Sequence, residues 1–326
     1  MSDSTDMLPR GVEDMKSFAL EIGHDLRLVQ GAGGNLSVKV DNTLWIKASG
    51  TRLAEATARP IFVPLRLAET RAAVLETESF GHLVRADYAD SGLRPSIETA
   101  LHALLPHAFV FHTHSTGAIA WGLSLDGHPI SSEGWFDLLV VPYAKPGLEL
   151  ARAVMAALGS GTGSERPLAL LLVNHGVVTA ADDAATAAAV TRAVHARFAS
   201  AAPPASSPVD SSGTPEGWRL LHPAGTVGEG ASRLLRLGAL TPDEAVFLGP
   251  HPFATRDEAD DAAAIVTDDG AVWLRDDLGQ DEAEIAISIV DVARLSDAPR
   301  ARALTASEVD SLINWEAEKW RRSLKR

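Results

Sequence analysis

The chain has 326 residues, of which 46% are hydrophobic and 22% charged, and it contains no cysteine. This composition is typical of a folded globular protein of about two domains, and the absence of cysteine excludes disulfides, thiolate metal ligands and a thiol nucleophile. A formal charge of −14 opposes binding to nucleic acid or to an anionic membrane surface, so any anionic substrate must be held by local groups.

Neither a secretion signal nor a membrane span is expected. The N-terminus lacks a basic segment leading into an apolar one. The longest apolar runs, such as residues 168–173, are far shorter than the roughly 18 residues that a transmembrane helix needs. We therefore expect a cytoplasmic protein.

One segment has the composition of a linker. Residues 201–217 are rich in Pro, Ser, Ala and Gly, and such a stretch does not bury enough apolar surface to fold. The sequence therefore predicts a domain at residues 1–200, a linker at 201–217 and a smaller module at 218–326.

Helical and extended patterns alternate before the linker, which is typical of an α/β fold. A helical stripe covers residues 11–28, and Asp41-Asn42 predicts a hairpin between strands at 36–40 and 43–48. The elements expected next are helices at 66–77 and from Ser96, strands at 109–114 and 138–142, a helix at 147–158, strands on both sides of a turn at 174–176, and a helix that Asp182 or Asp183 caps and that ends near residue 199.

The module after the linker also has an α/β pattern. We expect strands at 245–250, 263–268 and 271–275, and helices at 279–295 and 305–324. The last helix opens with Thr305 and Glu308 at capping-box spacing, and it ends in Arg and Lys residues that complement the helix dipole. We find no chemical motif in this module.

Three histidines are candidates for a metal site. His112 and His114 alternate along a strand, so both side chains point to one face, about 6.6 Å apart. That spacing suits one divalent ion, although two histidines on a half-exposed strand fit it as well. His175 stands in an Asn-His-Gly turn, where Gly176 permits a tight bend and the ring either enters a cleft or bonds locally.

Glu98 and Tyr143 are the candidates for proton transfer. Glu98 is expected in the first turn of a helix capped by Ser96. It is either an ordinary acid favoured by the helix dipole or a catalytic carboxylate beside a cation. Tyr143 follows the strand at 138–142, where its phenol either donates a proton or fills the core.

Two glycine-containing turns are candidates for anion binding. Residues 31–35 and 47–51 combine flexible backbone N–H groups with an amide and hydroxyls. The first is not a dinucleotide fingerprint, since Leu36 stands at the third glycine position, and neither is a P-loop. We expect a phosphate nest that needs no lysine or arginine. Lys47 is interpreted as a solvated strand residue, with contact to the ligand as the alternative.

Six motifs, taken in order, resemble those of the class II aldolase/adducin family: GAGGNLSVK, KASGT, PSIETALH, VFHTHS, VPYAKPG and VNHGVV. They cover about residues 11–200, and no single generic motif explains six matches at such spacing. The family includes zinc-dependent fuculose-phosphate and rhamnulose-phosphate aldolases. The resemblance implies an α/β fold with a class II aldolase-like mixed, largely antiparallel central sheet flanked by helices, to which this chain adds a smaller C-terminal α/β module.

The resemblance also implies a role for each matching residue. His112, His114 and His175 match the ligands of Zn²⁺ or another divalent metal. Glu98 matches the acid/base carboxylate, and Tyr143 matches a tyrosine that handles a proton at the aldehyde oxygen in a neighbouring subunit's site. The substrate- and phosphate-binding residues are Gly34, Asn35, Ser49, Gly50 and Ser96. Because active sites of this family lie between subunits of a homotetramer, we expect a homo-oligomer.

One departure from the aldolase pattern bears on the acid group of the substrate. That pattern has two adjacent serines before the catalytic glutamate, whereas this chain has Ser96 followed by Ile97. The missing hydroxyl costs on the order of 1.5–3 kcal/mol of binding. We still expect a phosphate, with a carboxylate or a differently placed acid group as the alternative.

These expectations define a function. The sequence predicts a metal-dependent lyase that cleaves a ketose phosphate to dihydroxyacetone phosphate and an aldehyde, with Glu98 transferring the proton at carbon. An epimerase, dehydratase or decarboxylase on a sugar phosphate would use the same metal-stabilised enediolate, although Glu98 favours the aldolase. A non-catalytic adducin-like interaction module is a further alternative, which the complete set of three histidines and Glu98 opposes.

Overall fold

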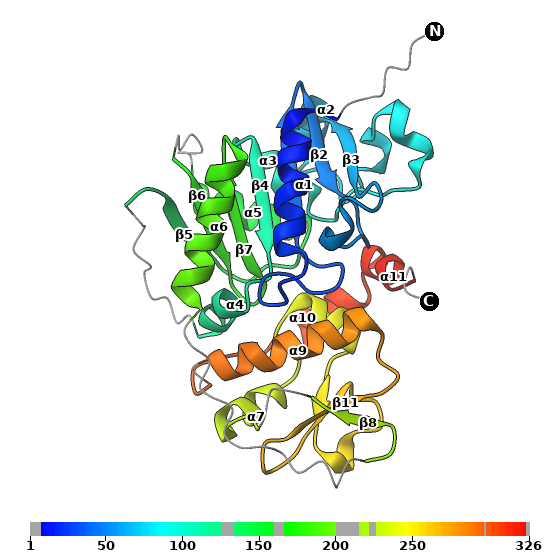
Figure 1. The fold of residues 1–326 in the computed structure, drawn as a ribbon, viewed down its shortest axis with the longest axis vertical. Coiled ribbons are helices and arrows are strands. Elements are labelled where there is room, and N and C mark those ends of the chain that lie inside the picture. Colours follow the sequence, from blue (N-terminus) through cyan, green and yellow to red (C-terminus); the bar gives the residue numbers. More distant parts are fainter. Residues whose placement is uncertain are drawn as a thin grey trace.

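A computed structural model describes residues 8–124, 134–159, 166–199, 215–221, 226–296 and 298–323. Two sheets form its framework: a seven-stranded sheet built from residues 35–181 and a four-stranded sheet in the C-terminal part (Figure 1). Most of the predicted linker at 201–217 lies outside the described residues.

The large sheet is mixed, with the strand order β3-β2-β1-β4-β7-β6-β5. Neighbouring strands are antiparallel except for β5 and β6, which run parallel. Its strands are β1 (Asn35–Val40), β2 (Thr43–Lys47), β3 (Phe62–Arg66), β4 (Phe109–Thr113), β5 (Asp137–Val141), β6 (Leu168–Leu172) and β7 (Gly176–Ala181). The predicted mixed, largely antiparallel sheet is confirmed.

Helices cover both faces of this sheet and make a three-layer structure (Figure 1). One face is covered by α1 (Arg10–Ile22), α4 (Thr116–Leu123) and α6 (Ala184–Phe198), and the other by α2 (Leu67–Ala73), α3 (Thr99–Leu104) and α5 (Leu148–Leu158). Along β4, Phe109 and Phe111 pack toward α1, while Val110 between them packs on the side of α5. Because both faces are covered, the side chains that point to either face of the sheet are buried.

Local signals in the sequence explain several element boundaries. Asp41 and Asn42 both have positive φ, 47° and 60°, which is the conformation of a two-residue hairpin turn. Asp183 caps α6, since its Oδ1 accepts a hydrogen bond from the Thr186 amide at 2.8 Å. The predicted hairpin and cap are both confirmed.

The C-terminal part forms a second α/β unit around its own sheet, with the order β8-β11-β10-β9. Its elements are β8 (Trp218–Leu220), α7 (Glu229–Leu235), α8 (Pro242–Leu248), β9 (Phe253–Ala254), β10 (Ala264–Val266), β11 (Val272–Arg275), α9 (Gln280–Leu295), α10 (Ala306–Ile313) and α11 (Glu316–Ser323). Helix α9 lies between the two sheets (Figure 1), and residues of α4 join its hydrophobic core. Within the described ranges, no helix combines the length and apolar character that crossing a membrane demands.

Short 3-10 helices complete the described elements. They are η1 (Leu53–Glu55), η2 (Gly81–Leu83), η3 (Ala86–Ser91) and η5 (Arg256–Glu258).

Two predictions for the C-terminal part are wrong in detail. The apolar run at 245–250 was expected as a strand, but most of it belongs to helix α8. Thr241 and Glu244 form a capping box directly before that run and Pro242 occupies the first helical turn, so the local start signal outweighs the apolar run. The helix expected at 305–324 is divided, because α10 ends at Ile313 and Trp315 turns away to donate a hydrogen bond to Glu78.

Candidate metal centre

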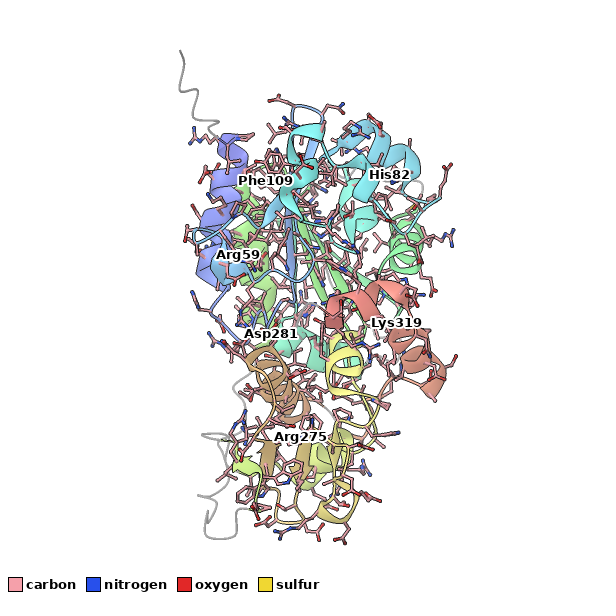
Figure 2. All side chains as sticks on the ribbon, turned by 90° about the vertical axis from the view of Figure 1, so that its right-hand side faces the viewer. Arg59, His82, Phe109, Arg275, Asp281 and Lys319 are labelled. Carbon is pink, nitrogen blue, oxygen red and sulfur yellow. The ribbon has the colours of Figure 1, made fainter. Side chains whose placement is uncertain are left out.

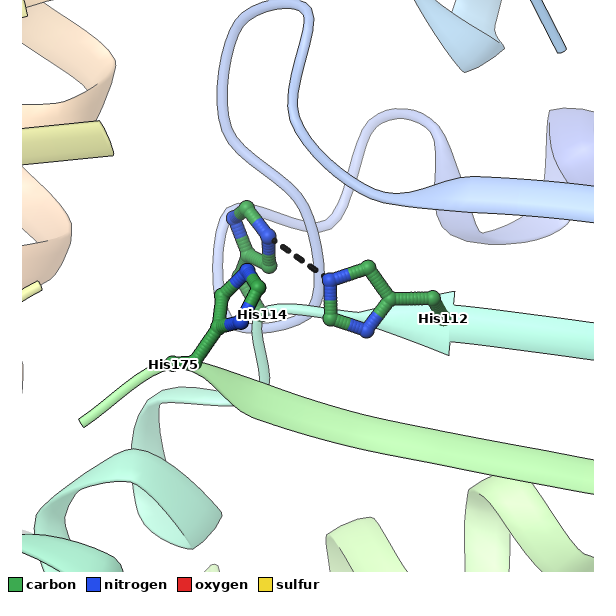
Figure 3. A group of neighbouring side chains, drawn as sticks. All are labelled: His112, His114 and His175. Atoms are coloured by element: carbon green, nitrogen blue, oxygen red, sulfur yellow. Dashed lines mark hydrogen bonds between the residues drawn. The ribbon is translucent and has the colours of Figure 1, made fainter. Parts of the chain in front are cut away.

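Sheet topology brings the three histidines together. Strands β4 and β7 are adjacent and antiparallel, so the end of β4 lies beside the beginning of β7. His112 is the second-last residue of β4, His114 follows that strand, and His175 immediately precedes β7. The three buried rings turn toward one another (Figure 3), and one ligand atom from each lies within 4.8 Å of the others.

The tight turn between β6 and β7 fixes the position of the third ring. Asn174 has a φ of 57°, and its Nδ2 donates to the carbonyl oxygens of Leu240 at 2.9 Å and Arg302 at 3.1 Å. A Cβ at Gly176 would lie 2.4 Å from the Thr113 carbonyl oxygen, so only glycine fits there. The C-terminal part therefore holds one of the turns that carry the candidate ligands.

Hydrogen bonding and burial leave these rings ready to bind a cation. His112 Nδ1 donates to the Val177 carbonyl at 3.0 Å, so the lone pair of this ring is on Nε2, the nitrogen that faces the other histidines. His112 Nε2 lies 3.2 Å from His114 Nε2. Two ligands of a tetrahedral zinc ion are separated by about 3.3 Å when each bond is roughly 2.0–2.1 Å long. Burial lowers the pKa of His114 and His175 to about 3, so both rings are neutral at pH 7, the form that binds metal.

The Glu98 carboxylate lies directly against two of the rings. Its Oε2 is 3.6 Å from His112 Nε2, and its Oε1 is 3.6 Å from His175 Nε2. Glu98 is buried, and Oε1 has no hydrogen-bond partner among the described residues. Burying a carboxylate without a partner is costly unless a positive charge compensates it. Three imidazoles beside this carboxylate fit a divalent metal such as Zn²⁺.

Glu98 stands one residue before helix α3, not inside its first turn as expected. Ser96 Oγ accepts a hydrogen bond from the Glu98 amide at 3.2 Å, and the Ser96 carbonyl accepts one from the Thr99 amide at 3.1 Å. The chain therefore completes a turn before the helix begins at Thr99. This turn directs the carboxylate toward the histidines.

A pocket beside the histidines contains all of the predicted anion-binding residues. It is lined by Gly34, Asn35, Ser49, Gly50 and Ser96, together with Glu98, His114 and His175. Asn35 Nδ2 donates to Ser96 Oγ and so joins two segments of the predicted nest. Some backbone donors of these turns are already engaged, since the Gly33 amide bonds to the Gln30 carbonyl at 2.8 Å and the Ser49 amide to the Arg94 carbonyl at 2.9 Å.

Lys47 is buried and lines this pocket, so its interpretation as a solvated residue is wrong. Its exposed fraction is 3%, and its Nζ donates to the carbonyls of Ala32 at 2.9 Å and Thr51 at 2.7 Å. Burial lowers its pKa to about 7. The expectation failed because every residue of β2 is buried, so that strand has no solvated face.

Tyr143 does not line this pocket within the single chain. It follows β5 and packs against a hydrophobic cluster of the C-terminal part that includes Leu304 and Leu312. The Arg302 guanidinium lies 5.6 Å from the ring centre. Burial raises the pKa of the phenol, whose hydroxyl has no hydrogen-bond partner among the described residues. The structure thus brings the three histidines and Glu98 together, but not Tyr143.

Two residues of the pocket come from the C-terminal part and were missed. Asp243 belongs to α8 and Arg321 to α11. Asp243 Oδ2 lies 3.6 Å from His114 Nδ1, and its Oδ1 accepts a hydrogen bond from Arg321 Nη2 at 3.1 Å. Neither residue stands in a motif, and an arginine near the end of a helix is ordinarily interpreted as a complement to the helix dipole. Only the packing of the two parts of the chain reveals them.

Comparison with known proteins gives a match to part of the chain. An uncharacterized oxidoreductase, YuxG, of Bacillus subtilis (strain 168) is 30% identical over 193 residues, which cover 55% of this chain and 27% of that protein. The chain therefore spans only about a quarter of that relative.

Solved structures also match part of the chain. The N-terminal class II aldolase domain of a conserved Thermoplasma acidophilum protein is 25% identical, with a TM-score of 0.45, and the match covers 61% of this chain and 97% of that one. An L-fuculose-1-phosphate aldolase from Thermus thermophilus is 18% identical, with a TM-score of 0.41, and the match covers 57% of this chain and 90% of that one.

A family match covers more than half of the sequence. Residues 18–200 match the class II aldolase and adducin N-terminal domain, a range that contains the three histidines, Glu98 and the predicted nest. The motifs that suggested this family lie in the same range. The chain therefore belongs to the class II aldolase and adducin N-terminal domain family.

Proposed function

We propose that this protein is a metal-dependent, aldolase-type lyase that cleaves a ketose phosphate to dihydroxyacetone phosphate and an aldehyde. The placement of Glu98 carries the proposal, because each of its carboxylate oxygens lies 3.6 Å from a ring nitrogen of the histidine cluster. Cleavage of a C–C bond next to a carbonyl needs such a proton-transfer group beside an electrophilic centre.

His112, His114 and His175 would hold the ion, Zn²⁺ or another divalent metal, through one ring nitrogen each. When bound, the ion supplies Lewis acidity toward the carbonyl and hydroxyl oxygens of the substrate. The chain contributes oriented rings, of which those of His114 and His175 are neutral. Burial provides the neutrality, and the hydrogen bond from His112 to Val177 sets the orientation of one ring.

Glu98 moves the proton in this reaction. When the bond between the two fragments breaks, its electron pair stays on the carbon next to the carbonyl, and Glu98 delivers a proton to that carbon. A second proton leaves the hydroxyl that becomes the aldehyde oxygen, and solvent returns it to the Glu98 carboxylate, so that no net proton is gained or lost. Tyr143 does not line the pocket of its own chain, so it would act at that oxygen only in the site of a neighbouring copy. This role requires the expected homo-oligomer, which we propose to be a tetramer.

The phosphate would bind at the end of the pocket formed by the two glycine-containing turns. Its donors would be the amide of Asn35, the hydroxyls of Ser49 and Ser96, and the backbone of Gly34 and Gly50. The direct bond from Asn35 to Ser96 supports this assignment, because it orients two of the donors toward one place.

We also propose that residues 1–200 form the catalytic domain, residues 201–217 a linker and residues 218–326 a separate module. All seven strands of the large sheet fall in the first segment, and all four strands of the small sheet in the last. The two units share a hydrophobic core, in which Ile119 and Leu123 of α4 meet Ile285 and Ile289 of α9.

The products of the zinc-loaded full chain test the proposed reaction. A panel of ketose 1-phosphates would be incubated with the protein and followed by proton and phosphorus NMR. We expect equal amounts of dihydroxyacetone phosphate and an aldehyde, which Glu98→Gln forms at least about 10²-fold more slowly under the same conditions. Formation of an epimer would instead identify an epimerase, a dehydrated sugar phosphate a dehydratase, and released carbon dioxide a decarboxylase. No reaction at full zinc occupancy would contradict the proposal.

A further inference from the structure

The C-terminal module places a buried arginine at the wall of the candidate active-site pocket. Arg321 lies in the last turn of helix α11, the helix that also carries Lys319 and that lies at the junction of the two parts of the molecule (Figure 2). Its exposed fraction is 8%, and it lines the same pocket as Asn35 and Ser49. Burying an ionised side chain is unfavourable unless other groups compensate its charge.

Two carboxylates hold the guanidinium in a fixed position. Arg321 Nη1 donates to both oxygens of Glu318, at 2.7 and 2.9 Å, and Nη2 donates to Asp243 at 3.1 Å. Glu318 is only 1% exposed. These three hydrogen bonds, formed among the described residues, leave two of the five N–H donors of a guanidinium for a ligand. Asp243 also contacts His114, so the arginine is tied to the candidate metal centre.

The charge balance of the pocket gives this arginine a role. Among the described lining residues the acids are Glu98 and Asp243, and both would repel an anionic substrate group. The basic residues are Lys47, whose buried amine is engaged with two backbone carbonyls, and Arg321, whose guanidinium is always charged. The glycine-containing turns offer neutral donors only, and several of their amides are already bonded. A guanidinium suits this task because its planar donors match phosphate oxygens in pairs.

We propose that Arg321 binds the phosphate group of the substrate, so that the C-terminal module completes the active site within the same chain. The inference rests on the proposed function for the identity of the substrate as a phosphate ester. Arg321 thereby supplies a permanent positive charge, which the turns at 31–35 and 47–51 do not offer because the amine of Lys47 is buried against two backbone carbonyls.

Helix α11 is anchored well enough to present this side chain in one place. Trp320 stacks under the Arg94 guanidinium, 4.2 Å from its ring centre, and Trp315 donates through Nε1 to Glu78 at 3.0 Å. The Trp315 ring also fills the space beside Gly147, where a Cβ would lie 2.9 Å from it. Both tryptophans therefore dock the end of the chain onto the catalytic domain, which reduces the entropy lost when a ligand binds.

Binding of inorganic phosphate to the metal-free full chain tests the inference without relying on catalysis. Calorimetry would compare the unmodified protein with Arg321→Lys and with the double variant Glu318→Gln/Arg321→Gln, which does not leave Glu318 as an unpaired buried charge. Arg322→Gln is the matched control, because Arg322 is the next residue of the same helix and donates to the Ile313 carbonyl. Circular dichroism would verify that each variant is folded.

We expect both Arg321 variants to bind phosphate at least about tenfold more weakly, and Arg322→Gln to bind like the unmodified protein. Unchanged affinity in either folded Arg321 variant would overturn the inference, as would the absence of phosphate binding to the unmodified chain. Acetate would be titrated in the same way. If the Arg321 variants lost binding of acetate but kept binding of phosphate, the inference would be overturned in favour of a carboxylate site. If phosphate binding depends on Arg321 but no ketose phosphate is cleaved, the lyase proposal fails and the anion site stands.

Discussion

Replacing Lys47 with methionine tests whether a lysine is buried in its neutral form beside the candidate metal centre. The side chain is 3% exposed, and its Nζ donates two hydrogen bonds, which match the two N–H groups of a neutral amine. Burial lowers the pKa from 10.5 to about 7. A difference of that size corresponds to about 5 kcal/mol against the ionised form.

The sign of the pH dependence follows from proton binding. Between the two pKa values the unfolded chain binds a proton at Lys47 that the folded chain does not, so the free energy of unfolding increases with pH in this window. In Lys47→Met the contribution of this group is absent. The lost hydrogen bonds to Ala32 and Thr51 lower the stability of the variant at every pH, whereas the slope reports the titration alone.

Urea unfolding of the metal-free protein at a series of pH values provides the measurement. Between about pH 7.5 and about pH 9.5, the free energy of unfolding of the unmodified protein should rise by about 2.5 kcal/mol more than that of Lys47→Met. Parallel profiles for the two proteins would refute the assignment of a buried neutral lysine.

Three further predictions concern the site and the assembly. Glu98→Gln should keep the fold and the metal, measured by circular dichroism and elemental analysis, while turnover falls by about 10²–10⁴-fold because the proton donor is lost. Asn35→Ala should weaken binding of the phosphorylated substrate by about 1–3 kcal/mol in calorimetry and leave zinc affinity unchanged; full activity on the dephosphorylated sugar would place the anion site elsewhere. Light scattering should show a homo-oligomer, and a fully active monomer at micromolar concentration would contradict a role for Tyr143 across subunits.

Predictions from local patterns succeeded where one segment contains the whole signal. The hairpin at Asp41-Asn42 and the cap at Asp183 are short-range features, and both are present. The strand at 245–250 failed because its apolar run fits a buried helix as well as a strand, and the capping box before it decides between them. The division of the last helix depends on Trp315 docking against a distant segment, which no local pattern records.

The same distinction explains which site residues could be predicted. The histidines and Glu98 lie in short motifs. The antiparallel pairing of β4 with β7 brings the histidines together at the end of β4 and the beginning of β7. Asp243 and Arg321 reach the pocket only because the C-terminal module packs over it, and neither has a neighbour in sequence that marks it. Lys47 was misinterpreted because its burial follows from helices covering both faces of the sheet, which is a property of the whole fold.

Zinc X-ray absorption on the loaded full chain tests the central claim, a metal centre formed by three histidines, most directly. The spectrum should fit three imidazole nitrogens at about 2.0–2.1 Å, and His175→Ala should lose one of them together with most of its zinc affinity. Zinc surrounded by oxygen ligands alone, or a spectrum that His175→Ala leaves unchanged, would contradict the assignment of His112, His114 and His175 as the metal ligands.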